Sequence, residues 1–60
     1  MELGRAAEIL LGMDEGLIRR RSGLKGFYGR LIKRRAWKSI HFTRPMSVDD
    51  MLANDWEVMR

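Results

Sequence analysis

The chain has 60 residues, no cysteine, one histidine and a formal net charge of +4. This composition excludes a disulfide framework and a thiolate metal site, and no apolar run approaches the ~18 residues of a membrane-spanning helix. We expect one domain over residues 1–60. A core of this size rarely supplies more than about 3–5 kcal/mol of stability, so the sequence is compatible with both a monomer and a homodimer.

The N-terminal stretch predicts an amphipathic helix over residues 3–14. Gly16 stands where a left-handed residue commonly ends a helix, so the helix is expected to stop just before it. Apolar residues recur at the i, i+3, i+4, i+7 spacing of one helix face, namely Leu3, Ala6, Ala7 and Leu10.

The middle of the chain is rich in strand-forming residues. The segment GLIRRRS (16–22) is short and compatible with a strand. Residues 27–42 combine aromatic and β-branched side chains, and the glycines at 26 and 29 weaken a helix start, so strands are favoured there. A basic helix over 27–40 stays open as an alternative, because an i+4 row supports it, formed by Tyr28, Ile32, Ala36 and Ile40.

The C-terminal stretch predicts a short capped helix followed by a strand. Pro45 ends the preceding element, and Ser47 with Asp50 three residues on forms a pair like a capping box. Asp49 also suits the positive N-terminal end of a helix. From Trp56 onward the residues alternate as in a final strand, and we expect Trp56 in the core.

The charges are segregated along the chain. Residues 16–44 hold ten Lys or Arg residues and no acid, whereas residues 1–15 and 45–60 each hold four acids and one Arg. A segment with so many positive charges and no acid typically binds an anion. The candidates are nucleic acid, a nucleotide, an acidic protein surface and the acidic ends of the chain itself.

Nine basic residues are candidates for contact with that anion, because Arg can bind phosphate or carboxylate in bidentate fashion. On a strand, Arg20 would lie on the opposite face from Arg19 and Arg21. The cluster at 33–35, with Lys38, indicates a hairpin turn. The basic candidates are Arg19, Arg20, Arg21, Lys25, Arg30, Lys33, Arg34, Arg35 and Lys38.

A second candidate surface is acidic and would imitate nucleic-acid phosphates to a DNA-binding channel. Helix capping and internal pairing explain the same residues more simply. Trp37, beside the second basic cluster, is a candidate interface aromatic, although a place over the core is favoured. The acidic candidates are Asp49, Asp50, Asp55 and Glu57.

No pattern supports catalysis. The adjacent carboxylates Asp49 and Asp50 diverge in the first turn of a helix, and the serines lack a base at a plausible spacing. His41 has no Cys or Ser partner, and no glycine-rich phosphate loop is present. We therefore expect a binding protein with no catalytic residue, no metal and no cofactor.

The C-terminal segment resembles a known signature. Proline, a capping Ser, an acidic pair, Met-Leu-Ala and Asn-Asp-Trp-Glu-Val (45–58) are similar to the end of the family of the second Thoeris anti-defence protein. The resemblance covers roughly residues 3–22 and 45–59. It implies an α+β fold, in which an N-terminal helix packs on a small antiparallel sheet of three to four strands, with the short capped helix before the last strand.

The resemblance also implies a function. Members of this family are phage counter-defence proteins, some of which sequester cyclic nucleotide signals as homo-oligomers, and some relatives are labelled anti-CRISPR. The chain also resembles small anti-CRISPR proteins. The first expectation is therefore a stoichiometric inhibitor that blocks target-DNA engagement by a CRISPR–Cas effector in the cytoplasm of an infected bacterium, with no membrane partner. The alternatives are an oligomeric nucleotide sponge and a direct nucleic-acid-binding protein.

Overall fold

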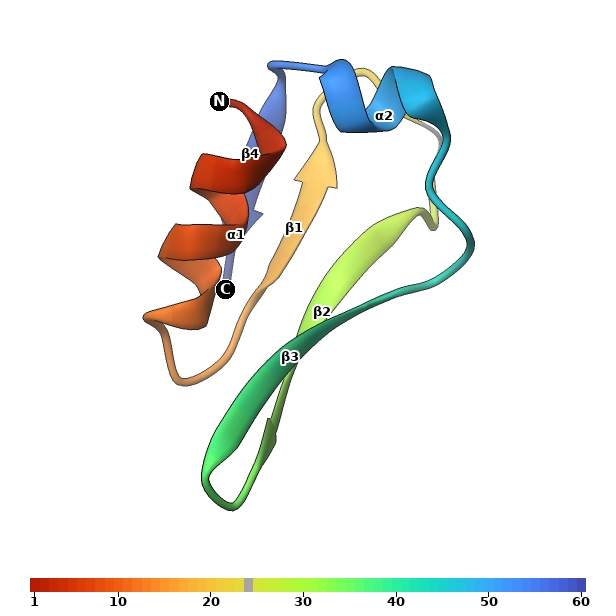
Figure 1. Ribbon diagram of the computed structural model, residues 1–60. Coiled ribbons are helices and arrows are strands. Elements are labelled where there is room, and N and C mark those ends of the chain that lie inside the picture. Colours follow the sequence, from red (N-terminus) through yellow and green to blue (C-terminus); the bar gives the residue numbers. More distant parts are fainter. Residues whose placement is uncertain (24) are drawn as a thin grey trace.

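The computed structural model describes residues 1–23 and 25–60 and has an α+β fold with a four-stranded antiparallel sheet (Figure 1). The strand order is β3-β2-β1-β4, so the last strand pairs with the first. The predicted arrangement is confirmed, and residues 27–42 hold two strands rather than a helix. The elements in chain order are α1 (Leu3–Leu11), β1 (Leu17–Arg20), β2 (Tyr28–Arg34), β3 (Trp37–Phe42), α2 (Val48–Leu52) and β4 (Trp56–Met59).

The helix α1 ends at Leu11, not at residue 14 as predicted. Gly12 follows as its cap and donates its backbone N–H to the carbonyl oxygen of Ile9 at 3.1 Å. A glycine inside a helix costs up to ~1 kcal/mol, which makes Gly12 a natural stop. Gly16 instead leads into β1 with φ +150°, where a Cβ would lie 2.7 Å from the carbonyl oxygen of Met59. The prediction that Gly16 ends the helix is therefore wrong.

One apolar core lies between α1 and the sheet. Ala6 and Leu10 belong to the predicted helix face and are fully buried. Trp56 is buried as predicted, and its indole Nε1 donates to the carbonyl oxygen of Asp50 at 2.9 Å. This bond satisfies a buried donor and ties α2 to β4. Among the residues that the structure describes, the buried hydrophobic ones are Ala6, Leu10, Ile18, Phe27, Leu31 and Trp56.

Gly29 makes room for the aromatic part of this core. A Cβ at position 29 would lie 2.6 Å from the Phe42 ring and 2.8 Å from Cγ2 of Ile40. The ring centroid of Phe42 lies 6.0 Å from that of Phe27 and 6.1 Å from that of Trp56. The glycine that disfavours a helix over 27–40 is thus also required by the packing of the strands.

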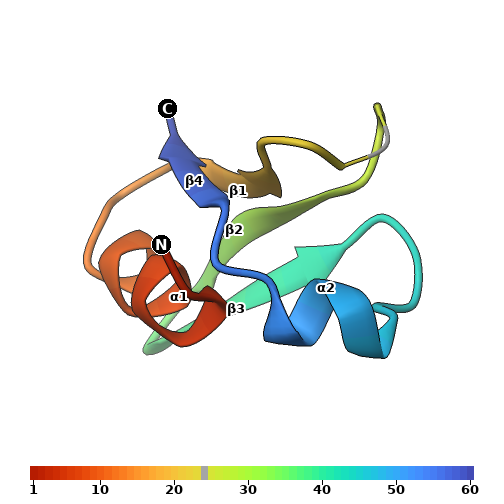
Figure 2. The same ribbon diagram turned by 90° about the horizontal axis from the view of Figure 1, so that it is seen from above.

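Both helices lie on the same side of the sheet (Figure 2). The far end of the β2–β3 hairpin projects beyond α1 (Figure 1), and its turn is formed by Arg35 and Ala36, as the basic cluster indicates. On the opposite side of the sheet, no helix is present in the described part of the chain. None of the described helices has the length and apolar character needed to cross a membrane.

Candidate functional site

The sheet turns one face to the helices and the other to solvent. Ile18 and Leu31 point into the core, so their neighbours along each strand point away from it. The antiparallel register places these outward residues in rows across the sheet. We call this surface the open face, and its residues are Leu17, Arg19, Tyr28, Arg30, Ile32, Arg34, Trp37, Ser39, His41, Glu57 and Met59.

The register decides which side chains are neighbours on the open face. Arg30 of β2 lies between His41 of β3 and Leu17 of β1. Arg34 lies opposite Trp37, next to the hairpin turn. Adjacent strands are about 4.8 Å apart, so the members of a row are close enough for side-chain contact.

The open face is strongly basic. Arg19 lies beside Glu57 of β4, and Arg21 reaches the same carboxylate from the turn after β1. Both guanidinium–carboxylate distances are 3.9 Å and both Arg side chains are more than half exposed, so these ion pairs are weak. Among the described residues, no carboxylate lies within ion-pair distance of Arg30 or Arg34. The cations of this surface therefore remain available to an anion.

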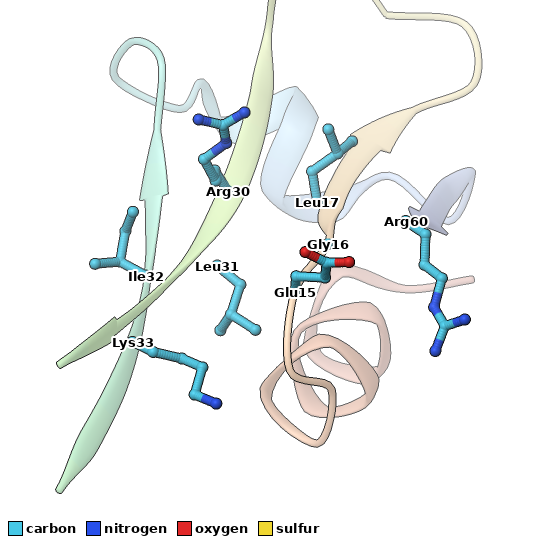
Figure 3. Close-up of a pocket in the computed structure, with 8 residues that line it drawn as sticks. All are labelled: Glu15, Gly16, Leu17, Arg30, Leu31, Ile32, Lys33 and Arg60. Atoms are coloured by element: carbon cyan, nitrogen blue, oxygen red, sulfur yellow. The ribbon is translucent and has the colours of Figure 1, made fainter. Parts of the chain in front are cut away.

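A hollow of about 590 Å³ opens where β1 and β2 separate (Figure 3). Gly16 and Leu17 border it on the β1 side, and Arg30, Ile32 and Lys33 border it on the β2 side. The side chains of Glu15 and Arg60 also line it, so one acid faces three cations. Residues from both faces of β2 line the hollow, so it is a gap beside this strand that is open to solvent rather than an enclosed pocket.

A second hollow, of about 570 Å³, extends along β1 from Leu17 to Arg21. The side chains of Tyr28 and Met59 form part of its apolar lining. Among the described residues, five cations and no acid line it, namely Arg19, Arg20, Arg21, Lys25 and Arg60. The charge of this lining is therefore positive throughout.

Arg20 lies on the helix side of the sheet and binds two acids of the C-terminal stretch. Its Nε donates to Asp55 and its Nη1 donates to Asp50, both at 2.9 Å. Asp55 also accepts hydrogen bonds from the backbone N–H and the hydroxyl of Ser22. Asp50 completes the predicted capping box with Ser47. The prediction that Arg20 opposes the other two arginines of its cluster is confirmed.

These hydrogen bonds shift the pKa values of the three charged groups. The bond from Arg20 is the main reason that the pKa of Asp55 lies well below its ordinary value, and Ser22 adds to it. The pKa of Asp50 is lowered in the same way, first by Arg20 and then by Ser47. Asp55, followed by Asp50, raises the pKa of Arg20 in turn. Both carboxylates are thus ionised and engaged, whereas Asp49 is exposed on α2 and Glu57 lies on the open face.

Two lysines of the predicted basic group also face away from the open face. Nζ of Lys33 donates to Asp14 Oδ1 at 3.3 Å. Nζ of Lys38 donates to the carbonyl oxygens of Leu11 and Met13 at 3.1 and 2.7 Å, at the C-terminal end of α1, where a cation is favoured. The remaining predicted residues are Arg19, Arg30 and Arg34 on the open face, Arg21 beside it, Lys25 in the second hollow, and Arg35 in the hairpin turn.

Several residues of the open face were not predicted from the sequence. Trp37 is 57% exposed there, so the favoured place over the core is wrong. Arg44, also not predicted, lies outside the open face, with its guanidinium 4.9 Å from the centroid of the ring of the core residue Phe27. Strict alternation counted from Ile18 would have identified the outward residues of β1. The outward residues of the other strands follow from how those strands pair with β1 and with each other. The open-face residues that the sequence did not single out for binding are Leu17, Tyr28, Ile32, Ser39, His41 and Met59.

No family model, no curated protein and no solved structure matches this chain. The resemblance of residues 3–22 and 45–59 to a counter-defence family, and the inhibitor and sponge functions that it implies, stay predictions. No set of three His, Asp or Glu side chains within residues 1–23 and 25–60 is placed to hold a metal ion. The arrangement is suited to binding an anion over an extended surface.

Proposed function

We propose that this protein binds nucleic acid through the open face of its sheet. The observation that supports the proposal is a set of guanidinium groups on the open face, which no described element covers. Arg30 and Arg34 are four residues apart on β2, about 13 Å along the strand, and Arg19 lies on the adjacent strand. Several cations spread over one surface suit a ligand whose negative charges repeat along its length.

Nucleic acid fits these side chains better than a small anion does. The planar guanidinium donates two hydrogen bonds to one phosphate, and phosphate contacts supply most of the sequence-independent affinity for nucleic acid. The two hollows beside β1 are broad, at about 590 and 570 Å³, and both are open to solvent. A polymer that crosses the sheet can use both hollows together.

The acidic residues give less support to a surface that imitates nucleic acid. Asp50 and Asp55 are bound by Arg20 on the helix side, so two of the four predicted acids are engaged inside the protein. Glu57 lies among arginines on the open face. The exposed charge that is gathered on one surface is therefore positive.

Fluorescence anisotropy with a labelled oligonucleotide of about 12 nucleotides tests the proposal. Titrations from roughly 50 to 200 mM salt should give a logarithm of the binding constant that falls linearly with the logarithm of salt concentration. Arg30→Gln should weaken binding and make this slope shallower by about one. Arg5→Gln is the matched control, since it removes one exposed cation from α1 on the other side of the sheet.

Two results would contradict the proposal. The first is no binding of either a single-stranded or a double-stranded oligonucleotide at the lowest salt concentration. The second is an equal loss of affinity in the Arg30 and Arg5 variants, because net charge and not the open face would then determine binding.

A second candidate function is the inhibition of a CRISPR–Cas effector by direct binding. It is favoured by α2, which buries only the acid Asp50 while Val48, Met51 and Leu52 are 67%, 52% and 79% exposed. Apolar side chains gathered outward on a helix are typical of a protein-binding surface. A pull-down from CRISPR-bearing cells with the natural chain and with Leu52→Asp checks it. Recovery of a Cas subunit by the first and not by the second supports inhibition, and recovery by neither contradicts it.

A further inference from the structure

The indole of Trp37 is exposed on the open face, and the positive charge of that face does not account for an exposed aromatic side chain. The side chain lies at the start of β3, directly opposite Arg34 at the end of β2. It is 57% exposed, whereas the indole of Trp56 is 1% exposed. An indole turned to solvent beside a guanidinium group is available to stack against a flat ligand.

Further flat side chains lie on the same face. His41 is on the same strand as Trp37, four residues on and about 13 Å away, and its Nε2 lies 3.0 Å from the hydroxyl of Ser39. Tyr28 lies at the opposite end of β2 from Arg34 and is half-buried. Each of these rings therefore lies opposite a guanidinium group on the open face: Trp37 opposite Arg34, His41 opposite Arg30 and Tyr28 opposite Arg19.

We infer that the ligand of the open face is a single strand of nucleic acid, with a base stacked on Trp37 and phosphates on Arg30 and Arg34. The inference rests on the proposed function and specifies the form of its ligand. In a duplex the flat faces of the bases are stacked against one another, whereas a single strand offers them to aromatic side chains. Stacking accepts every base, so little sequence preference is expected.

Charge argues against a second copy of the chain as the occupant of the same surface. Two open faces placed against each other would bring Arg19, Arg30 and Arg34 of both copies together, with Glu57 as the one acid that the described residues place on each face. A duplex is a different case, because a two-stranded ribbon such as β2–β3 can enter a major groove. That mode would use the hairpin turn and would leave the flat face of the indole without a base.

The test compares three probes of equal length: a single strand, the duplex of the same sequence, and a single strand whose central nucleotides lack bases. DNA and RNA versions are used for the intact single strand. The natural chain should bind the intact single strand most tightly. Trp37→Ala should weaken that binding about 5- to 100-fold, and Trp37→Phe should restore most of it. On the probe without bases, the alanine variant and the natural chain should bind alike.

A direct signal accompanies the titration. Trp56 is 1% exposed and lies in the core, so quenching of tryptophan fluorescence by the single strand reports on Trp37. The Trp37→Phe variant should bind with little quenching. Circular dichroism of both variants checks that they fold, as the exposed position of the side chain leads us to expect.

The outcomes separate the two proposals. Binding of no probe at low salt contradicts the proposed function itself. Binding of single strand and duplex with equal affinity, together with no effect of Trp37→Ala, leaves nucleic-acid binding in place and overturns the inference of a stacked single strand. Equal affinity of the natural chain for the intact and the base-free strand overturns it as well, without the need for any variant.

Discussion

Arg20 and the two carboxylates that it binds make the stability of the fold depend on pH. The pKa values of Asp50 and Asp55 are both lowered in the folded chain, mainly by hydrogen bonds from Arg20. A carboxylate with a lowered pKa stabilises the fold above its unfolded pKa of about 4, and that contribution is lost as the pH falls further. The raised pKa of Arg20 does not affect this range, because the guanidinium stays charged throughout.

We therefore expect the free energy of unfolding, measured by urea denaturation, to fall as the pH drops below about 4. Asp55→Asn should be less stable than the natural chain at pH 7 and should lose less stability on acidification. Asp49→Asn is the control, since Asp49 is exposed and does not contact Arg20. The same pH profile in both variants would show that the Arg20 pairs do not cause the dependence.

Gly29 carries a prediction about packing. A methyl group at this position would lie 2.6 Å from the ring of Phe42, which is packed between other aromatic rings. Gly29→Ala should lower the free energy of unfolding by about 1–3 kcal/mol. Gly4→Ala, where nothing lies within 4 Å of the added atom, should raise it by about 0.5–1 kcal/mol. Urea denaturation at neutral pH measures both, and a shift of the same sign would contradict this account of Gly29.

At the scale of the elements, α2 shows how a very short helix is held. Its five residues are too few to be stable alone, and its large apolar side chains do not pack on the sheet. Three polar contacts fix it instead: the cap at Ser47, the bond from Arg20 to Asp50, and the indole of Trp56 on a backbone carbonyl. The position of α2 therefore depends on these polar contacts and not on the burial of its apolar side chains.

Removal of the cap should have a measurable cost. Ser47→Ala should lower the free energy of unfolding by about 1 kcal/mol, because it leaves the backbone N–H of Asp50 without its acceptor. Ser47→Asn should retain most of the stability, since Asn caps helices about as well as Ser. Thermal denaturation followed by circular dichroism compares the three chains. An alanine variant as stable as the natural chain would mean that α2 is held without its cap.

The elements that were predicted correctly are those whose signals are local. The apolar face of α1, the capping box of α2 and the burial of Trp56 each follow from residues a few positions apart. The features that were not predicted depend on strand pairing. Trp37 lies on the open face opposite its register partner Arg34, and Arg20 meets two acids that are 30 and 35 positions along the chain. No periodicity within a single segment contains that information.

The end of α1 was predicted wrongly for a related reason. In the sequence, Gly16 fits a left-handed cap, but the helix ends earlier, before Gly12. The structure uses Gly16 for a close approach to the Met59 carbonyl oxygen, a contact between segments far apart along the chain. Of the candidate site, the sequence singled out the basic residues as one group, and their binding role stays a prediction; the division of that group between two faces required the fold.

At the scale of the whole molecule, six buried hydrophobic residues of the described chain form the core, and Trp56 is the largest of them. Trp56→Ala should cost about 3–5 kcal/mol, which is comparable to the whole stability expected of so small a domain. We expect this variant to be largely unfolded at 25 °C by circular dichroism. Trp37→Ala, at an exposed position, should change stability by no more than about 0.5 kcal/mol. A cooperative transition near that of the natural chain in the Trp56 variant would contradict this view of the core.

The strand order has a consequence for the time course of folding. The β2–β3 hairpin closes through a two-residue turn, whereas β4 must return to β1 across most of the chain. Loop closure costs more entropy over a longer segment, so we expect the hairpin to form early and β4 to dock last. Because Trp56 belongs to β4, its burial would mark the final step, and Trp37 would already occupy its place in the hairpin while the core is still being completed.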